Sequence, residues 1–259
     1  MPQPPIAPQP AAPPAYWQAW PSIGLTGLVL AIMGLSAAAT SSLFYILGDG
    51  SKISLWLLWQ WQADGPLSQA QQIFVYWVSA ASGFGMVFYL IGRNGGPSAI
   101  DYLALHPVLP KRILTWLAGL LVFYSLFVMI PTIVATQKGF ASPIQRPEFL
   151  YFITIVMIAP VLEEVIFRGF LFIGLLHSRA SITMVILLPT IIWTVAHLRL
   201  QVDWISDLHA LGIIFCFGII LSAARIRSNS LLLPIVLHSS WNALVIMVDA
   251  LIIAFLPTH

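Results

Sequence analysis

The sequence predicts an all-α integral membrane protein with about seven transmembrane helices and a polar cavity between the fourth, fifth and seventh spans. Three observations support this fold class. The chain is 59% hydrophobic and only 8% charged, whereas a soluble domain carries about 25% charged residues. Its apolar segments recur near the roughly 20 residues that a helix needs to cross a bilayer. Three of those segments carry short polar motifs, which are costly in a helix that faces only lipid.

The first 21 residues differ in composition from the rest of the chain. They contain eight of the 19 prolines and neither lysine nor arginine, so we expect an extended, largely polyproline tail rather than a signal peptide. Tyr16, Trp17 and Trp20 are expected to anchor the chain at the membrane interface. After this tail over 1–21, we expect N-terminal helices and interfacial segments over 22–140 and a functional core over 141–259.

The apolar runs give the boundaries of the spans. We expect spans at about 22–47, 74–92, 113–136, 149–175, 181–198, 208–224 and 229–255. The segments 51–62 and 101–112 are expected to lie at the membrane interface. Lysines and arginines of the connecting loops divide six to four in favour of the side that carries the N-terminus, which predicts a cytoplasmic N-terminus. The short length and the lack of an organelle-targeting signature favour a bacterial inner membrane, or a thylakoid membrane in a photosynthetic cell.

The remaining composition argues against several classes of function. The net charge is +2 and no basic cluster is dense enough to follow a nucleic-acid backbone, so we expect no nucleic-acid partner. The single cysteine, Cys216, rules out an intrachain disulfide and a CxxC metal site. We expect this cysteine to be a small buried apolar side chain.

Polar residues inside the predicted spans are the main functional signal, because an ionisable group in a span tends to face a bundle interior or a wet cavity. A glutamate–arginine pair or a single histidine can serve helix packing alone. Chemically matched groups on three helices favour a shared site instead. These groups are Glu163, Glu164 and Arg168 in the fourth span, His197 in the fifth, and His238 and Asn242 in the seventh.

Helical spacing predicts how these groups are presented. Glu164 and Arg168 are four residues apart and share one face, so they can pair. Glu163 is rotated by about 100° from Glu164 and therefore points elsewhere. His238 and Asn242 are also four apart, and they present two polar groups to one side of the seventh span.

The fifth span raises a question of depth. Trp193 lies one turn before His197 and can form a wall of the pocket beside it. However, His197 falls at the far end of a span that runs opposite to the fourth. These boundaries therefore predict different depths for His197 and Glu163, and a common site requires Pro160 and Pro189 to bend or interrupt their helices.

Together these groups have the chemistry to hydrolyse a peptide bond. A carboxylate and a histidine can activate water, and a second histidine with an asparagine amide can supply donors to a developing oxyanion. No serine or cysteine nucleophile is required. Alternatively, the glutamates and histidines can bind a divalent metal such as zinc, although adjacent glutamates form a poor chelate and no HExxH motif is present. The residues leave open both a reaction without a cofactor and a metal-dependent one.

Three motifs, taken in order, resemble the CPBP family (CAAX protease and bacteriocin processing), which contains the type II CAAX prenyl endopeptidases and the bacterial Abi proteins. The EExxxR motif is EEVIFR over 163–168, followed by glycine. The second motif, usually FxxxH, is WTVAH over 193–197, with tryptophan in place of phenylalanine. The third, HxxxN or HxxxD, is HSSWN over 238–242. The resemblance covers about 149–245.

The resemblance implies a catalytic role for four of the residues. Glu163 would be the general base, and His197 would assist it in activating water. His238 and Asn242 would stabilise the oxyanion. On this view the reaction is a direct attack of water on the peptide carbonyl.

The same resemblance implies an orienting pair and a metal-dependent alternative. Glu164 and Arg168 would orient the site. The family is commonly labelled a metalloprotease, and in a metal-dependent reaction Glu163, His197 and His238 would be the ligands. The residues themselves favour neither a metal-dependent nor a metal-independent reaction.

We therefore expect an intramembrane endopeptidase that acts on a membrane-associated protein or peptide and is surrounded by the lipid bilayer. Bacterial members of the family need not act on prenylated proteins, so the substrate is left open. One rival function is a catalytically silent scaffold or accessory subunit of a larger membrane complex, in which the proline-rich tail and the many tryptophans would bind a partner. A second rival is a small transporter that uses Glu163 and Glu164 as proton or cation sites.

Overall fold

The computed structural model describes residues 16–47, 68–131, 149–198 and 204–255, and every regular element in these ranges is a helix. The first are α1 (Ala19–Leu47), α2 (Gln69–Arg93), α3 (Ala99–Tyr102), α4 (Pro110–Tyr124) and the π-helix η2 (Ser125–Met129). The fourth span runs through α6 (Phe149–Ile153), η3 (Thr154–Ile158), α7 (Ala159–Glu164), η4 (Val165–Leu171) and α8 (Phe172–His177). The last are α9 (Ile182–Ala196), α10 (Trp204–Ser228) and α11 (Leu232–Phe255).

The seven predicted spans all correspond to helices of the structure. Among the described residues, five helical segments are long and apolar enough to cross a membrane, namely Ala19–Phe44, Ala70–Arg93, Pro110–Met129, Phe149–His177 and Leu208–Ser228. The fifth and seventh predicted spans are the shorter apolar helices Ile182–Ala196 and Leu232–Val248. The prediction of an all-α membrane protein is confirmed.

The N-terminal boundary differs from the expectation. α1 begins at Ala19, three residues before the predicted span, and it includes Pro21 in its first turn. Proline is tolerated there because the N–H groups of a first turn have no acceptor within the helix. Trp17, expected at the membrane interface, donates its indole N–H to the Leu90 carbonyl of α2 at 3.1 Å. Residues 1–15 of the expected tail and the segment 51–62 lie outside the described residues.

The first part of the segment 101–112, predicted to lie at the membrane interface, packs into the protein instead. Tyr102 and Leu103 are fully buried. The chain turns after α3, and the Ala104 carbonyl accepts a hydrogen bond from the Leu231 N–H at 2.9 Å. The apolar side chains of this segment therefore cover the turn between α10 and α11 rather than lipid.

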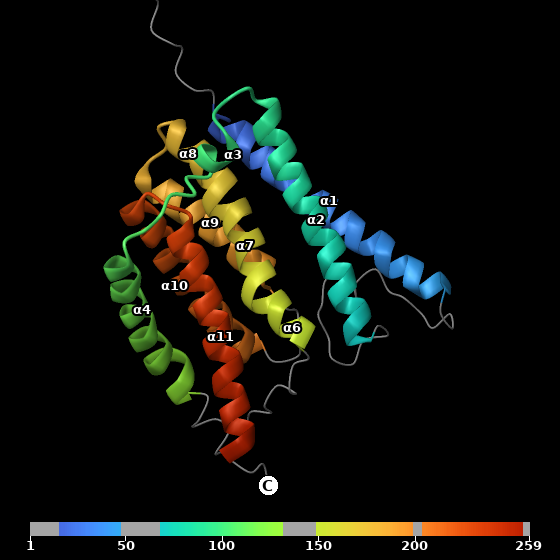
Figure 1. Ribbon diagram of the computed structural model, residues 1–259, viewed down its shortest axis with the longest axis vertical. Helices are drawn as coiled ribbons and strands as arrows, with labels where there is room; N and C mark the ends of the chain where they lie inside the picture. The colour runs from blue at the N-terminus through green and yellow to red at the C-terminus, as the bar shows by residue number, and fades with distance from the viewer. Residues whose placement is uncertain (1–15, 48–67, 132–148, 199–203, 256–259) are drawn as a thin grey trace, which may run out of the picture.

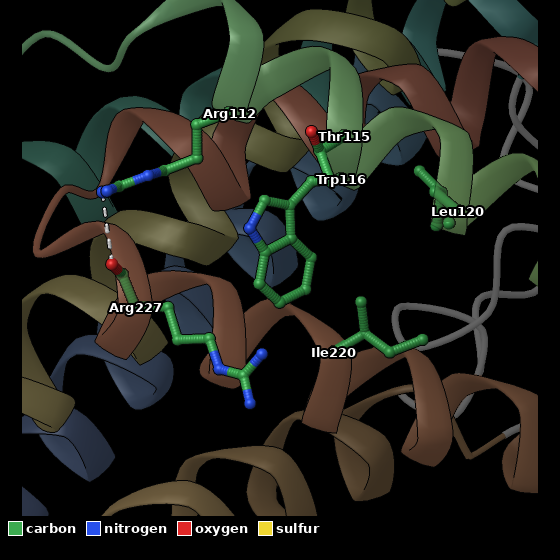
Figure 2. Close-up of a pocket in the computed structure, with 7 residues that line it drawn as sticks. Arg112, Thr115, Trp116, Leu120, Ile220 and Arg227 are labelled. Atoms are coloured by element: carbon green, nitrogen blue, oxygen red, sulfur yellow. Dashed lines mark hydrogen bonds between the residues drawn. The ribbon is translucent and has the colours of Figure 1, made fainter.

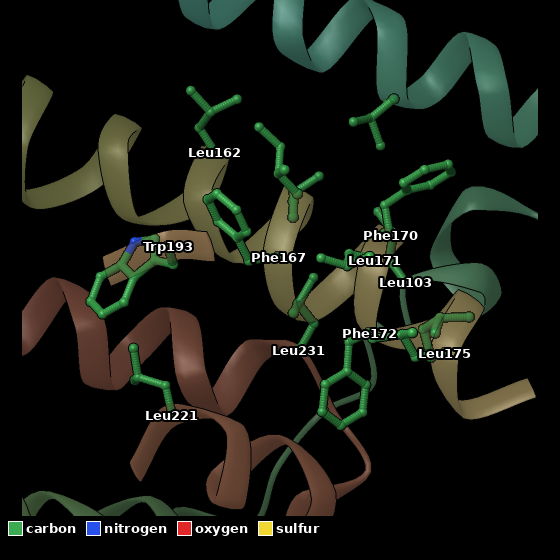
Figure 3. Packing of buried hydrophobic residues seen from close by; sticks show 14 of the residues in the cluster. Leu103, Leu162, Phe167, Phe170, Leu171, Phe172, Leu175, Trp193, Leu221 and Leu231 are labelled. Carbon is green, nitrogen blue, oxygen red and sulfur yellow. The ribbon is translucent and has the colours of Figure 1, made fainter. Parts of the chain in front are cut away.

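The fourth span lies at the centre of the bundle (Figure 1). The antiparallel pair α1 and α2 covers one side of it, α9 and α11 contact it elsewhere, and α4 lies at the outer edge against α11. Figure 3 shows Phe167 and Phe170 of this span packed among Leu103, Leu221 and Leu231 from other segments. The fourth span, which carries three of the six predicted site residues, is therefore the most deeply buried of the candidate membrane spans.

Cys216 is exposed on α10, contrary to the expectation of a buried side chain. Its neighbour Phe217 is 1% exposed and points into the bundle. Successive side chains of a helix are rotated by about 100°, so Cys216 is turned toward the outer surface. In a spanning helix that surface faces lipid, which accommodates a small apolar thiol as well as a protein core does.

Two π-helical stretches interrupt the fourth span on either side of its adjacent glutamates. Pro160 explains the first, η3, because proline donates no N–H and its ring clashes with the preceding turn, which favours the wider i→i−5 pattern. The Ala159 N–H accordingly bonds to the Thr154 carbonyl. In this pattern the Ile155 carbonyl would accept from residue 160, which is proline, so this carbonyl needs a donor from another part of the chain.

Candidate active site

Glu164 and Arg168 form a fully buried ion pair within the fourth span. Arg168 Nη1 lies 3.0 Å from Glu164 Oε1, and neither side chain has exposed surface. Arg168 Nη2 donates to the Gly218 carbonyl of α10 at 3.2 Å, and the guanidinium lies 4.6 Å from the centre of the Trp193 ring. Loss of either charge would leave the other buried and uncompensated, so this pair fixes the position of the Glu164 carboxylate.

His238 connects this ion pair to the second glutamate. Its Nδ1 lies 2.9 Å from Glu164 Oε1, and its Nε2 lies 3.9 Å from Glu163 Oε2. Because a carboxylate oxygen accepts hydrogen bonds, Nδ1 carries a proton and Nε2 faces Glu163. The rings of Trp193 and Phe217 stand almost perpendicular to the imidazole and hold it in place.

Glu163 is the more exposed of the two glutamates, with 22% of its side chain exposed against none for Glu164. Its Oε2 accepts the indole N–H of Trp193 at 2.5 Å and lies 3.8 Å from His197 Nε2. The Nδ1 of His197 lies 2.8 Å from the Trp193 carbonyl. A carbonyl can only accept, so this Nδ1 also carries a proton and leaves Nε2 turned toward Glu163. One carboxylate oxygen thus faces an indole donor and two imidazole nitrogens.

His197 and Glu163 lie at the same depth, so the predicted difference in depth is wrong. The fourth span and α9 run antiparallel and are joined by the short turn 178–181. Glu163 lies fourteen residues before His177, the last residue of α8, and His197 lies fifteen residues after Ile182, the first residue of α9. At about 1.5 Å per residue, both lie roughly 20 Å from the turn. The distance from the shared turn, rather than the position within each span, sets the depth.

Asn242 makes its hydrogen bond to the backbone of the fourth span. Its amide nitrogen donates to the Ile155 carbonyl at 2.8 Å, which is the acceptor that Pro160 leaves without a helical donor. Asn242 follows His238 by one turn on the same face of α11. The structure therefore brings five of the six predicted residues into one network of side chains, and Asn242 joins α11 to the π-helix beside that network.

Trp193 contributes more to the site than the sequence indicates. The sequence places it one turn before His197 and predicts a wall beside the pocket. Its spacing gives no information about the direction of the indole N–H, which in the structure points at Glu163. This residue is also where the chain departs from the usual FxxxH motif, and phenylalanine has no such donor.

Two residues of α10 support Arg168 and carry no signal in the sequence. A Cβ on Gly218 would lie 2.8 Å from Thr190 Cγ2 and 3.1 Å from Arg168 Nη2, so only glycine lets α10 approach this closely. Arg225, expected in a loop after the sixth span, is 1% exposed within α10, and its Nε donates to the Arg168 carbonyl at 3.2 Å. Both positions depend on helix packing rather than on a local pattern.

The residues that the metal-dependent alternative requires are not arranged to hold an ion. In the part of the chain that the structure describes, no three His, Cys, Asp or Glu side chains form a group able to ligate a metal. Glu163 Oε2 already accepts the Trp193 N–H, and the Nε2 atoms of His197 and His238 lie 3.8 and 3.9 Å from it. A donor aimed at this oxygen competes with a cation for the same lone pairs.

Comparison with known proteins finds similarity in the C-terminal part of the chain. Residues 145–244 match the family model described as Type II CAAX prenyl endopeptidase Rce1-like, and this range contains all six motif residues. An Escherichia coli protein named "Uncharacterized 24.3 kDa protein" is 33% identical over 132 residues, which are 48% of this chain and 58% of that protein, so the match spans little more than half of its length. No solved structure matches the chain. The match over residues 145–244 confirms the resemblance carried by the three motifs: this part of the chain is similar to the Rce1-like type II CAAX prenyl endopeptidases.

Proposed function

We propose that this protein is an intramembrane endopeptidase that hydrolyses a peptide bond of a membrane-associated protein or peptide with a water molecule activated by Glu163 and His197. The family match supports a CAAX-type membrane protease in general terms. The finer proposal rests on the approach of two imidazole Nε2 atoms to one oxygen of Glu163, at 3.8 and 3.9 Å. These separations are too long for direct hydrogen bonds and suit a single bridging water.

Glu163 is suited to act as the general base. Its carboxylate is partly exposed, whereas that of Glu164 is buried against Arg168. A water at this position donates one hydrogen to Glu163 Oε2 and the other to the free Nε2 lone pair of His197. Its oxygen is then directed at a substrate carbonyl carbon, and Glu163 accepts a proton as the new carbon–oxygen bond forms.

His238 is suited to stabilise the oxyanion. In its protonated form Nε2 presents an N–H to the developing charge, while Nδ1 stays bonded to Glu164 Oε1. The buried carboxylate stabilises this imidazolium, and Arg168 holds the carboxylate in position. Asn242 uses one amide hydrogen on the Ile155 carbonyl and keeps a second N–H, which is the one that an oxyanion role would use.

The proton that Glu163 takes from water is returned to the substrate in the second step. When the tetrahedral intermediate collapses, the carbon–nitrogen bond of the substrate breaks and the amine leaves. The proton held by Glu163 passes to the amine nitrogen, which restores the carboxylate. His238 keeps both ring protons throughout, because it stabilises the oxyanion by a hydrogen bond and not by proton transfer.

Cleavage of a membrane-anchored fluorogenic peptide tests the proposal. The full chain in lipid vesicles would be compared with His197→Gln, His238→Gln and, as a matched control, His106→Gln, since His106 is exposed and lies outside the site. Each site variant should lower kcat/KM by about 100-fold or more, while the His106 variant keeps the wild-type value. Mass spectrometry of the products should show one scissile bond.

The same experiment contains the outcome that would overturn the proposal. If the wild type and the three variants are equally inert across a broad panel of anchored peptides, the protein is not the protease proposed. The catalytically silent scaffold would then become the better account, and co-purification with a membrane partner in a fixed ratio would be the next measurement.

A further inference from the structure

A cavity of about 580 Å³ lies between α4 and α10, away from the catalytic cluster. Figure 2 shows that its lining divides into two parts. Arg112 and Arg227 lie toward one end, Leu120 and Ile220 lie at the other, and the indole of Trp116 projects between them. None of these five residues belongs to the three polar motifs. The volume falls in the range of ordinary ligand-binding pockets.

The two arginines provide positive charge without an acidic partner. Arg112 Nη1 donates to the backbone carbonyl of Arg227 at 3.3 Å, which joins the first turn of α4 to the last turn of α10. Neither guanidinium is within ion-pair distance of a carboxylate in the described ranges of the chain. An anion bound at this end of the cavity would supply the missing counter-charge and accept hydrogen bonds from the arginines.

Apart from the two arginines and Thr115, the cavity lining is apolar. Leu120 is 2% exposed, and Trp116 and Ile220 are half-buried. Gly119 adds no side chain to the α4 wall of the cavity. A Cβ built at this position would meet no atom within 4 Å, so there is open space beside it. A free phosphate would gain nothing from this surface, whereas a hydrocarbon chain would bury it. Charge at one end and apolar surface at the other are complementary to an amphipathic anion.

The two arginines lie at the end of the bundle where α4 begins and α10 ends. The loop before α4 is held to the turn between α10 and α11, since Ser230 Oγ donates to the His106 carbonyl at 2.5 Å. At the same end, Tyr16 stacks on His177 at 3.7 Å and lies 5.2 Å from the Tyr102 ring, so the ends of α8 and α3 are neighbours. Anionic lipid headgroups attract basic residues near a membrane surface, and basic pockets between spanning helices bind such headgroups.

We propose that the cavity between α4 and α10 binds a phospholipid with an anionic headgroup. The phosphate lies between Arg112 and Arg227, and an acyl chain runs along Trp116, Leu120 and Ile220 into the membrane. The indole of Trp116 lies at the boundary between the two, as tryptophan does at membrane interfaces. This inference does not depend on the proposed protease activity.

Native mass spectrometry of the delipidated full chain tests the proposal, with phosphatidylglycerol and phosphatidylcholine as probes. The wild type should bind phosphatidylglycerol at least about tenfold more tightly than phosphatidylcholine. The double variant Arg112→Gln/Arg227→Gln should weaken phosphatidylglycerol binding by roughly 25-fold, at about fivefold per arginine. The matched control Arg93→Gln/Lys111→Gln removes the same charge outside the cavity lining and should change binding less than twofold.

A second variant tests the apolar part without altering charge. Gly119→Leu places a side chain in the cavity, removes no contact and replaces a residue that disfavours helix, so it should leave the fold intact. It should nevertheless lower phosphatidylglycerol binding about tenfold, because the acyl chain is excluded. This variant keeps the proposal testable if the arginine variant fails to fold.

Three results would overturn the proposal. One is equal binding of the two lipids by the wild type. Another is a Gly119→Leu variant that binds phosphatidylglycerol like the wild type. The third is displacement of the lipid by millimolar inorganic phosphate, which would show a site for free phosphate rather than for a phospholipid.

Discussion

The indole N–H of Trp193 donates a hydrogen bond to Oε2 of Glu163, with 2.5 Å between nitrogen and oxygen. The same ring lies edge-on to both site histidines, with centroid distances of 4.7 Å to His197 and 5.5 Å to His238. It also lies against the Arg168 guanidinium. One aromatic residue therefore contacts the proposed base, both imidazoles and the buried cation, and it sets their relative positions.

Replacing Trp193 by phenylalanine, the usual residue of the family motif, should keep the wall and remove the donor. We expect kcat to fall about tenfold with KM changed less than twofold, because a hydrogen bond to a charged group contributes about 1.5–3 kcal/mol and Glu163 loses its orientation. Steady-state cleavage of an anchored peptide measures both constants. Trp20→Phe, at a position that is 80% exposed, is the matched control and should behave as the wild type. An unchanged kcat in Trp193→Phe would show that the indole donor does not position Glu163.

The Glu164–Arg168 pair should control stability as well as activity. Arg168→Met breaks a fully buried ion pair and should lower the free energy of unfolding by about 3–5 kcal/mol, measured by chemical denaturation in detergent. The double variant Glu164→Gln/Arg168→Met removes both charges, so it should recover much of the stability. It should stay inactive, because His238 loses its carboxylate. If the double variant loses as much stability as Arg168→Met and Glu164→Gln lose separately when added together, the two charges are not coupled.

Asn242→Ala separates a structural role from an oxyanion role. The substitution leaves the Ile155 carbonyl without a donor, and an unsatisfied buried polar group costs about 1–3 kcal/mol. We expect this loss in the free energy of unfolding together with lower activity. Asn242→Asp should resemble it at neutral pH, since an ionised carboxylate cannot donate. A variant with wild-type stability and reduced kcat would instead assign Asn242 to the oxyanion alone.

Gly218→Ala should displace α10 from the residues that support the site. The new Cβ would lie 2.8 Å from Thr190 Cγ2 and 3.2 Å from Trp193 Cε3, so α10 must shift outward at a cost of about 1–3 kcal/mol. Activity should fall as Trp193 moves. Gly212→Ala on the same helix meets nothing within 4 Å and should be neutral or slightly stabilising. Equal behaviour of the two variants in denaturation and cleavage would contradict this packing argument.

The sequence predicts the helices well because the length of an apolar run is a local property. The second span illustrates the limit. α2 begins at Gln69, five residues before the predicted start, and is capped by Ser68, whose side chain accepts from the Gln71 N–H. A polar first turn carries no apolar signal, so hydropathy alone places the start too late.

The site is predictable where its contacts are local and unpredictable where they are not. The Glu164–Arg168 pair follows from a spacing of four residues. The bonds from Trp193 to Glu163 and from Asn242 to Ile155 join residues 30 and 87 positions apart. They depend on side-chain direction and on how the helices pack, and no periodic pattern contains that information. The depth of His197 was mispredicted for a related reason, since it depends on where the shared turn lies.

We propose that Glu163 is the general base and that it activates water without a metal. Glu163→Gln is the most direct test, because glutamine keeps the size of the side chain and an oxygen that can accept the Trp193 N–H, but it cannot accept the proton from water. Cleavage of the anchored peptide should fall at least about 100-fold, with stability retained within about 1 kcal/mol, and wild-type cleavage should be unaffected by EDTA or 1,10-phenanthroline. A Glu163→Gln variant that cleaves at more than half the wild-type rate, or wild-type activity that chelation abolishes and zinc restores, would contradict the account.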